Sequence, residues 1–99
     1  MIARTWHGMT STSRADDYLA FLESHALPDY RSIPGNIAAY ILRRVDGDTT
    51  HFTTLTFWSS HQAIEAFAGT DISRAKYYPE DKDFLLEFVS TVEHSGVYS

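Results

Sequence analysis

The first third of the chain contains a pattern typical of a strand, followed by a pattern typical of an amphipathic helix. Residues 2–9 contain Ile, Thr, Trp and His with Arg4 as the single charge, a composition that predicts a strand. Apolar side chains then recur at spacings of three and four, which predicts an amphipathic helix with Ala15, Tyr18, Leu19, Leu22 and Ala26 on one face. We expect Ser13 and Asp16 to form a capping box at the start of this helix, and the helix to end before Pro28.

The middle of the chain predicts a β-hairpin. A loop is expected over residues 28–35, and strands are expected over residues 36–45 and 49–58. The turn signal Asp46-Gly47 separates the two strands and suits a tight connection between them. The two strands should therefore pair with each other in antiparallel fashion.

A second amphipathic helix should follow the hairpin. Ser59 or Ser60 can cap its first turn, and Gly69 is suited to its end. Its apolar face consists of Ala63, Ile64 and Phe67. Residues 71–78 then predict a short helical segment, and residues 85–98 predict a fourth strand. The order β-α-β-β-α-β is that of the α+β ferredoxin-like fold, in which helices cover one face of a four-stranded antiparallel sheet.

Neither face of the predicted sheet is polar throughout. In one strand both alternating sets are apolar, namely Ile37, Ala39 and Ile41 on one side and Ala38, Tyr40 and Leu42 on the other. Two helices can cover one face only, so the other face needs a second cover. A second copy of the same sheet is the simplest cover and predicts a homodimer. The alternative is a monomer that exposes a weakly apolar face.

Composition limits the class of protein. The chain has 99 residues, enough for a single domain over residues 1–99, and no cysteine, which excludes disulfides and thiolate metal sites. Its net charge of −5 argues against nucleic acid or an anionic membrane as a partner. The uncharged residues 51–62 are too polar to span a bilayer, and the N-terminus lacks the pattern of a signal peptide. We therefore expect a cytoplasmic protein.

Aromatic residues are unusually frequent, at 14% of the chain. The side chains of Tyr40, Trp58, Phe67, Tyr77 and Tyr78 can line a flat apolar pocket for a ring-shaped ligand, although core packing would explain each one alone. Tyr77 and Tyr78 are adjacent and cannot face the same way on a helix. One of them is therefore expected to present its hydroxyl group to a cavity or an interface.

The region from residue 55 to residue 75 carries a family resemblance. A strand that ends in Trp58-Ser59-Ser60, a helix containing Ala-Ile-Glu-Ala-Phe and a following Asp-Ile-Ser-Arg-Ala segment resemble the antibiotic biosynthesis monooxygenase family. The order of elements agrees over nearly the whole chain. This resemblance implies a dimeric α+β barrel with a pocket between the sheet and the helices of each subunit. It also implies that some members oxidise anthrones or quinols with O₂, without a metal or flavin cofactor.

Other members of this family bind haem and degrade it. They use an asparagine on the first strand, a tryptophan on the second helix and a histidine iron ligand in the segment after that helix. The corresponding positions here are His7, Phe67 and Tyr77, so none of the three residues is kept. A phenolate can ligate haem iron, which leaves haem binding as a third interpretation.

Histidines supply the candidate bases. No pair of the five has the spacing of a strong metal motif, and we expect neither a metal nor a cofactor. We expect His7 to face the pocket, where a neutral imidazole can accept a proton from a phenol or anthrone, and Trp6 to face the dimer layer. His94 is the second candidate base. The structural alternative for His7 is a hydrogen bond to a backbone group.

These observations lead to one main hypothesis and one rival. The main hypothesis is cofactor-independent oxygenation of a small aromatic or quinol-like substrate, with His7 as the base. The substrate would contact Tyr40, Trp58, Phe67, Tyr77, Tyr78 and His94. The rival is a non-catalytic protein that binds or senses a small hydrophobic aromatic ligand in the same pocket.

Overall fold

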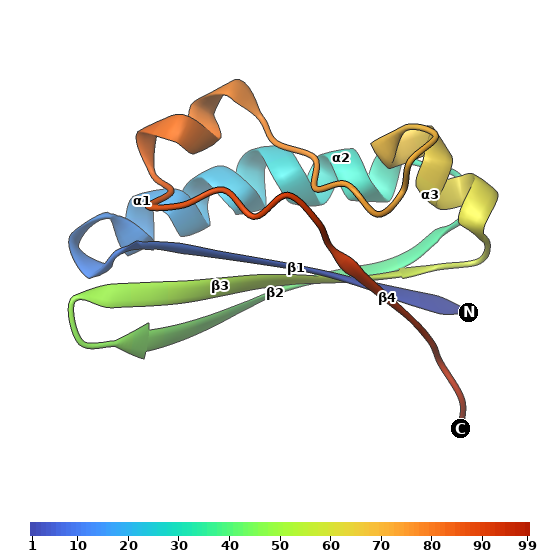
Figure 1. Cartoon of the computed structure of the whole chain (residues 1–99), viewed down its shortest axis with the longest axis horizontal. Helices are drawn as coiled ribbons and strands as arrows, with labels where there is room; N and C mark the ends of the chain where they lie inside the picture. Colours follow the sequence, from blue (N-terminus) through green and yellow to red (C-terminus); the bar gives the residue numbers. More distant parts are fainter.

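A four-stranded antiparallel sheet forms one layer of the molecule, and helices cover one of its faces (Figure 1). The computed structural model describes residues 1–99. The strands are β1 (Ile2–Ser11), β2 (Asn36–Asp46), β3 (Thr49–Trp58) and β4 (Glu93–Gly96), in the spatial order β2-β3-β1-β4. The predicted α+β class, ferredoxin-like element order and β2–β3 hairpin are confirmed.

The first helical stretch is longer than predicted. α1 (Ala15–Phe21) and α2 (Leu27–Ser32) are joined by a π-helical turn, Leu22–Ala26. The expectation that the helix ends before Pro28 was wrong, because Pro28 lies in the first turn of α2. A proline ring inside a regular helix clashes with the carbonyl group four residues earlier, and the wider π turn relieves this clash.

The predicted capping box at the start of α1 was also wrong. A 3₁₀ turn, Thr12–Arg14, precedes α1, and no side chain caps the helix. The Ser13 hydroxyl group instead lies 3.2 Å from that of Ser11. The Asp16 carboxylate turns outward and pairs with Arg43 of β2 at 2.7 Å.

The second predicted helix, α3 (His61–Ala68), forms as expected. Ser60 caps it by accepting a hydrogen bond from the Ala63 N–H at 3.2 Å. The helix ends at Gly69, whose φ of 91° suits glycine. None of the helices in the molecule is both long enough and apolar enough to cross a lipid bilayer.

The C-terminal part is less regular than predicted. Residues 71–78, which we call the strap, form no helix and cross the helix side of the molecule, where Arg74 forms an isolated β-bridge with Thr91 (Figure 1). A 3₁₀ turn, Pro79–Asp83, follows the strap. The strand predicted over residues 85–98 is reduced to the four residues of β4 and two isolated bridges, Leu85 with Thr10 and Thr91 with Arg74.

A buried carboxylate anchors this C-terminal part to α1. Asp81 is 3% exposed and accepts hydrogen bonds from the Tyr18 hydroxyl group at 2.9 Å and from the Tyr78 N–H at 2.6 Å. Burial raises the pKa of Asp81 above its ordinary value. Both carboxylate oxygens thus have a donor, which a buried charged group requires.

Alternation along the strands separates two faces of the sheet. In β1 and β3 the even-numbered residues face the helices, and in β3 all of these are buried. The odd-numbered residues face away from the helices and form what we call the open face. Tyr40 and Leu42 of β2 join the open face because they pair with Leu55 and Thr53. Tyr40 is 56% exposed and Leu42 is 48% exposed, so the open face is partly apolar and uncovered.

The contact between Tyr18 and Asp81 predicts a stability effect. We expect Tyr18→Phe to lower the free energy of unfolding by about 1–3 kcal/mol, because one oxygen of the buried carboxylate loses its donor. Urea denaturation measures the change. Tyr40→Phe, on the open face, is the matched control and should change stability little; equal losses in both variants would contradict the anchoring role of Asp81.

Candidate functional site

A buried arginine lies at the centre of the helix-covered side. β1 directs Arg4 toward the helices, where the residue is 4% exposed. Its Nη1 donates to the Ile72 carbonyl at 2.5 Å and its Nη2 donates to the Arg74 carbonyl at 3.1 Å, both in the strap. No carboxylate lies within 4.0 Å of the guanidinium. Burial lowers the pKa of Arg4 from its very high ordinary value.

A histidine of β4 contacts this arginine directly. His94 pairs with Arg4 in the β1–β4 register, and its Nε2 lies 3.0 Å from Arg4 Nη1. A guanidinium can only donate, so Nε2 must accept and the imidazole is neutral, with its proton on Nδ1. Burial, the Arg4 charge and His61 together lower the pKa of His94 below its ordinary value of 6.5. His94 is therefore a neutral proton acceptor held against a cation.

Aromatic side chains enclose the space beside Arg4. We call this space the inner cavity; its volume is about 10 Å³, close to that of a single water molecule. Its lining includes Arg4, Trp6, Tyr30, Phe67, Lys76 and Val92. The Phe67 ring has Arg4 5.9 Å and Lys76 4.2 Å from its centre. Two cations and three aromatic rings thus meet at one enclosed point.

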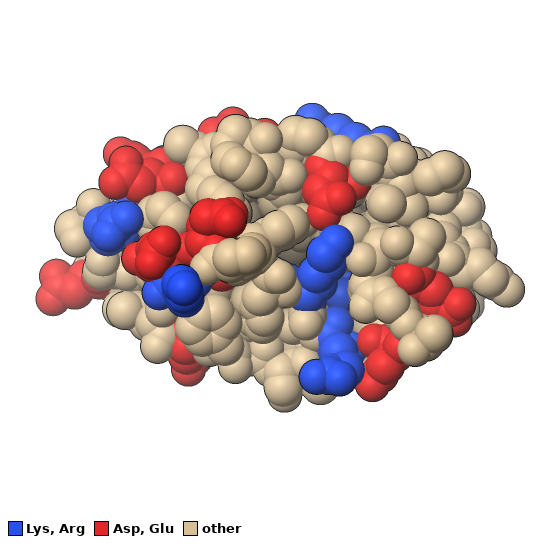
Figure 2. Space-filling model, turned by 90° about the horizontal axis from the view of Figure 1, so that it is seen from above, with Lys and Arg blue, Asp and Glu red and all other residues tan.

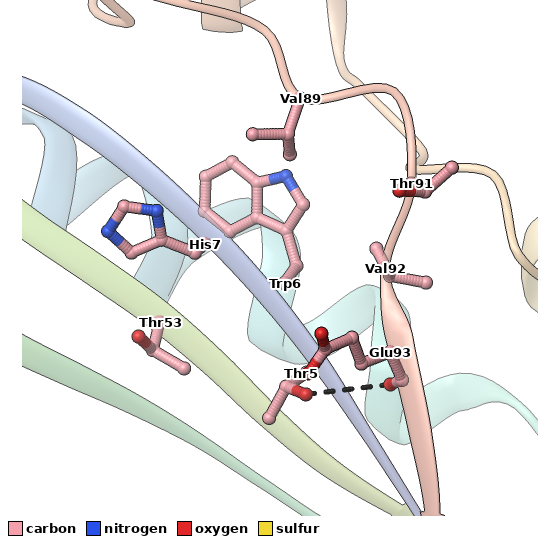
Figure 3. A pocket seen from close by; sticks show the side chains of 8 residues that line it. All are labelled: Thr5, Trp6, His7, Thr53, Val89, Thr91, Val92 and Glu93. Carbon is pink, nitrogen blue, oxygen red and sulfur yellow. Dashed lines mark hydrogen bonds between the residues drawn. The ribbon is translucent and has the colours of Figure 1, made fainter.

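A larger hollow lies next to the inner cavity, where β1 and β4 separate. β4 pairs with β1 only from Ile2 to Thr5, and the chain next contacts β1 through the Leu86 N–H, which donates to the Met9 carbonyl at 2.9 Å. Between these points lies a hollow of about 380 Å³, which we call the outer groove. Its lining residues are Thr5, Trp6, His7, Thr53, Val89, Thr91, Val92 and Glu93 (Figure 3). This volume is within the usual range for small-molecule sites.

Trp6 separates the outer groove from the inner cavity. Trp6 and Val92 line both spaces, and Figure 3 shows the indole beside Val89. The indole N–H donates to the Tyr77 hydroxyl group at 3.3 Å, and that hydroxyl donates to the Val89 carbonyl at 2.6 Å. Because the two spaces share Trp6 and Val92 as walls, we regard them as one candidate site.

The structure brings some of the predicted site residues together. Phe67 lines the inner cavity, His94 contacts Arg4, and Tyr77 holds Trp6 in place. Trp58 is fully buried, and its indole N–H donates to Thr56 at 2.8 Å, which fits the core-packing interpretation. The hydroxyl group of Tyr78, in contrast, donates to Asp29 at 2.5 Å on the helix side.

Two predicted site residues lie on the opposite face of the sheet. His7 and Tyr40 project from the open face, so the expectation that His7 faces the helices while Trp6 faces the dimer layer was wrong. The cause is the alternation of β1, which directs Arg4 and Trp6 inward together. His7 still reaches the rim of the outer groove, and its Nε2 lies 2.8 Å from His51 Nδ1. Its role as a base stays a prediction.

Sequence reasoning missed three residues of the site. Arg4 is the single charge in its predicted strand and lies two positions from Trp6, so period-two spacing could have placed them on one face. Tyr30 fell in a segment that was expected to be a loop. Lys76 belongs to the strap, where no local pattern shows that its ammonium group lies over Phe67.

Comparison with solved structures supports the fold. No family model matches the chain, and no curated protein matches it significantly. A proposed antibiotic biosynthesis monooxygenase of Nitrosomonas europaea matches with a TM-score of 0.71 and 16% identity over 100% of both chains. Rv0793 of Mycobacterium tuberculosis matches with a TM-score of 0.68 and 14% identity, over 99% of this chain and 95% of the other.

A haem-degrading protein also shares the fold. MhuD of Mycobacterium tuberculosis, solved with two haems in its active site, matches with a TM-score of 0.59 and 18% identity, over 98% of this chain and 95% of the other. These neighbours show that the chain has the fold of the antibiotic biosynthesis monooxygenase structures. The predicted resemblance is therefore confirmed for the fold.

The residues of the inner cavity do not fit a haem group. The Tyr77 hydroxyl, at the position of the iron ligand in haem degraders, already donates to Val89 and accepts from Trp6. Phe67 packs at 4.9 Å from Tyr30 and 5.8 Å from Trp58, measured between ring centres, and fills the space beside them. The side chains leave about 10 Å³, so we derive no chemistry through haem.

The lowered pKa of His94 predicts a pH effect on stability. Between that lowered value and 6.5 the unfolded chain binds a proton at His94 and the folded chain does not, so the free energy of unfolding falls as the pH falls. Thermal unfolding at about pH 7.5 and about pH 5.5 measures this loss. We expect His94→Gln, whose amide oxygen can accept from Arg4, to lose less stability than the wild type on acidification.

The exposed His25 provides a matched control for this experiment. His25→Gln should lose as much stability as the wild type between the two pH values. An identical loss in His94→Gln would show that His94 is not held neutral by Arg4.

Proposed function

We propose that this protein is a cofactor-independent monooxygenase that acts on a small phenolic or quinol-like aromatic substrate. The observation that carries the proposal is the contact between the neutral imidazole of His94 and the buried guanidinium of Arg4. One group can accept a proton, and the other can stabilise the anion that remains. Arg4 lines the small inner cavity together with Trp6, Tyr30 and Phe67, and His94 contacts Arg4.

In this proposal the protein activates the substrate rather than O₂. His94 would take a proton from the substrate at Nε2 once the Arg4 N–H has turned from that nitrogen to the substrate oxygen, which leaves an electron-rich anion paired with Arg4. Such an anion can reduce O₂ directly. For an anthrone-like ring carbon, one oxygen atom replaces two hydrogens to give a carbonyl group, and the second oxygen leaves with those hydrogens as water. Because the inner cavity of about 10 Å³ is smaller than an aromatic ring, this proposal requires the cavity to open, and Trp6, Tyr30 and Phe67 would then line the space around the ring.

We also propose that the active form is a homodimer in which two open faces pack together. Figure 1 shows that no helix covers this face. It presents Met9, Leu55 and Phe57, half-buried, together with the exposed Tyr40 and Leu42. A second copy would remove these apolar side chains from water, and the contact would be isologous.

A second candidate function is ligand binding without catalysis. The small volume of the inner cavity favours it, because the closed conformation admits about one water molecule and no aromatic ring. A ligand held only in the outer groove would contact Trp6 and His7 but would not reach His94. This candidate predicts tight binding with no uptake of O₂.

Oxygen consumption distinguishes the two candidates. With a panel of quinols and anthrones, we expect uptake of O₂ that His94→Gln lowers about a hundredfold, the lower range for loss of a positioned base. His7→Ala tests the other imidazole at the site and should change the rate little. His25→Gln is the control for a change at an exposed histidine.

Two results would contradict this assignment. A large loss in His7→Ala with none in His94→Gln would move the base to the open face. Binding of a panel compound without any O₂ uptake would favour the non-catalytic candidate.

Native mass spectrometry tests the dimer with two matched substitutions on β2. We expect a dimer for the wild type and a monomer for Leu42→Glu, since a charge would be buried between the two open faces. Val45 is 62% exposed but pairs with Thr50, so it points to the other side of the sheet. Val45→Glu should therefore remain dimeric, and a monomeric wild type would overturn the proposal.

A further inference from the structure

The buried charge of Arg4 is the least compensated feature of the molecule. A buried arginine normally pairs with a carboxylate, because transfer of an unpaired charge from water to the protein interior is costly. Here the guanidinium meets two carbonyl oxygens and an imidazole nitrogen, which are neutral acceptors. The hydrogen bonds are satisfied, but the positive charge has no counter-ion.

A second cation lies at the same cavity. The Lys76 ammonium group is above the Phe67 ring and 3.2 Å from Asp29, its own partner. Figure 2 shows that basic side chains gather in a band on the helix-covered side, with acidic side chains on either side of it. The chain as a whole carries a net charge of −5, and Asp29 compensates Lys76, but no carboxylate compensates Arg4.

The two carbonyl groups on Arg4 resemble the oxygens of an anion. They come from Ile72 and Arg74, two residues apart in the strap, and each accepts from a different terminal nitrogen of the guanidinium. A carboxylate presents two oxygens to the same pair of nitrogens in the common bidentate arrangement. The strap therefore occupies donors that suit a carboxylate better than two amide carbonyls.

The strap is attached in a way that allows this exchange. It forms no regular helix, and its backbone bonds to the following segment are the Ala75 N–H to Ser90, the Val92 N–H to Ser73 and the Asp81 N–H to Tyr78. Lys76 and Tyr78 also bind Asp29, so the strap is held most firmly at its end and less firmly at Ile72 and Arg74. Because Arg74 is exposed, water can hydrogen-bond to its carbonyl group when Arg4 turns to a ligand. The outer groove supplies space beside Trp6 for the body of that ligand.

We propose that Arg4 binds the carboxylate of an aromatic acid, and that the strap carbonyls fill this place when the ligand is absent. The aromatic ring of the ligand would lie in the outer groove against Trp6, Val89 and Val92, because the inner cavity is too small for it. This inference rests on the site of the proposed function and narrows its substrate class to ring compounds that carry a carboxylate. It concerns binding and does not depend on the oxygenation step.

Calorimetry on the full chain with two probes of nearly equal shape tests the proposal. Benzoate carries the carboxylate, and benzamide is its neutral counterpart. At constant ionic strength we expect benzoate to bind at least about tenfold more tightly than benzamide, a difference that comes from the charge. Inorganic phosphate, as the third probe, should compete weakly, because it gains nothing from the aromatic walls.

Three variants assign the effect to Arg4. Arg4→Gln should remove the preference for benzoate over benzamide, and Arg4→Lys should keep a charge but weaken benzoate binding, since the ammonium group lacks the paired donors. Lys82→Gln removes one exposed positive charge elsewhere and should bind benzoate like the wild type. Circular dichroism shows whether each variant folds. The comparison of benzoate with benzamide on the wild type tests the proposal even if a variant does not fold.

Several outcomes would overturn the proposal. These are equal affinity for benzoate and benzamide, no binding of benzoate up to about 10 mM, and unchanged binding in folded Arg4→Gln. Phosphate that competes as well as benzoate would indicate a site for small inorganic anions instead. O₂ uptake from neutral quinols tests the proposed function separately, so failure of one proposal is distinguishable from failure of the other.

Discussion

The buried guanidinium of Arg4 is the interaction on which the rest of the structure depends. It projects from a central strand and binds the strap through two carbonyl groups and β4 through His94. Residues about 70 and 90 positions away in the sequence are thereby fixed over one point of the sheet. The same three contacts join the strap and β4 to β1 beside the inner cavity, and the contact with His94 requires a neutral imidazole. Arg4 therefore contributes both to the fold and to the candidate site.

The register of β1 decides which chemistry lies on which face. Because side chains alternate, a shift of one position would exchange the two faces completely. With the observed register, Arg4 and Trp6 face the helices, while Thr5 and His7 face outward. The two histidines of the main hypothesis are consequently on opposite sides of the sheet. His94 meets the Arg4 guanidinium, whereas His7 meets a second imidazole, His51.

Periodicity and turn signals were sufficient to predict the regular part of this fold. The hairpin around Gly47, the Ser60 cap and the end of α3 at Gly69 follow from local preferences, and the structure contains all three. The errors concern segments whose conformation depends on distant groups. Pro28 is accommodated by a π turn, and the strap gives two carbonyl groups to Arg4 rather than to a helix.

The candidate site was harder to predict for the same reason. Phe67, Tyr77 and His94 were identified from residue type and resemblance, but their common neighbour Arg4 was read only as the charge of a strand. A charge inside a strand is usually solvated, and local sequence does not reveal that helices and the strap bury this one. The inward direction of a strand position depends on register, which short-range patterns do not determine.

The two strands that pair with β1 do so over very different lengths, so two parts of the molecule are held together by different numbers of backbone hydrogen bonds. β1 pairs with β3 from Ile2 to Ser11, and β3 pairs with β2 over a similar length, whereas β4 pairs only with the first residues of β1. The three long strands with α1 and α2 therefore share most of the backbone pairing, and the last quarter of the chain, held by few backbone pairs and by contacts such as Tyr18 to Asp81, is the part expected to open first. Local unfolding of this kind needs far less free energy than global unfolding. The inner cavity lies at the boundary between the two parts, so access to it is governed by the stability of the weaker one.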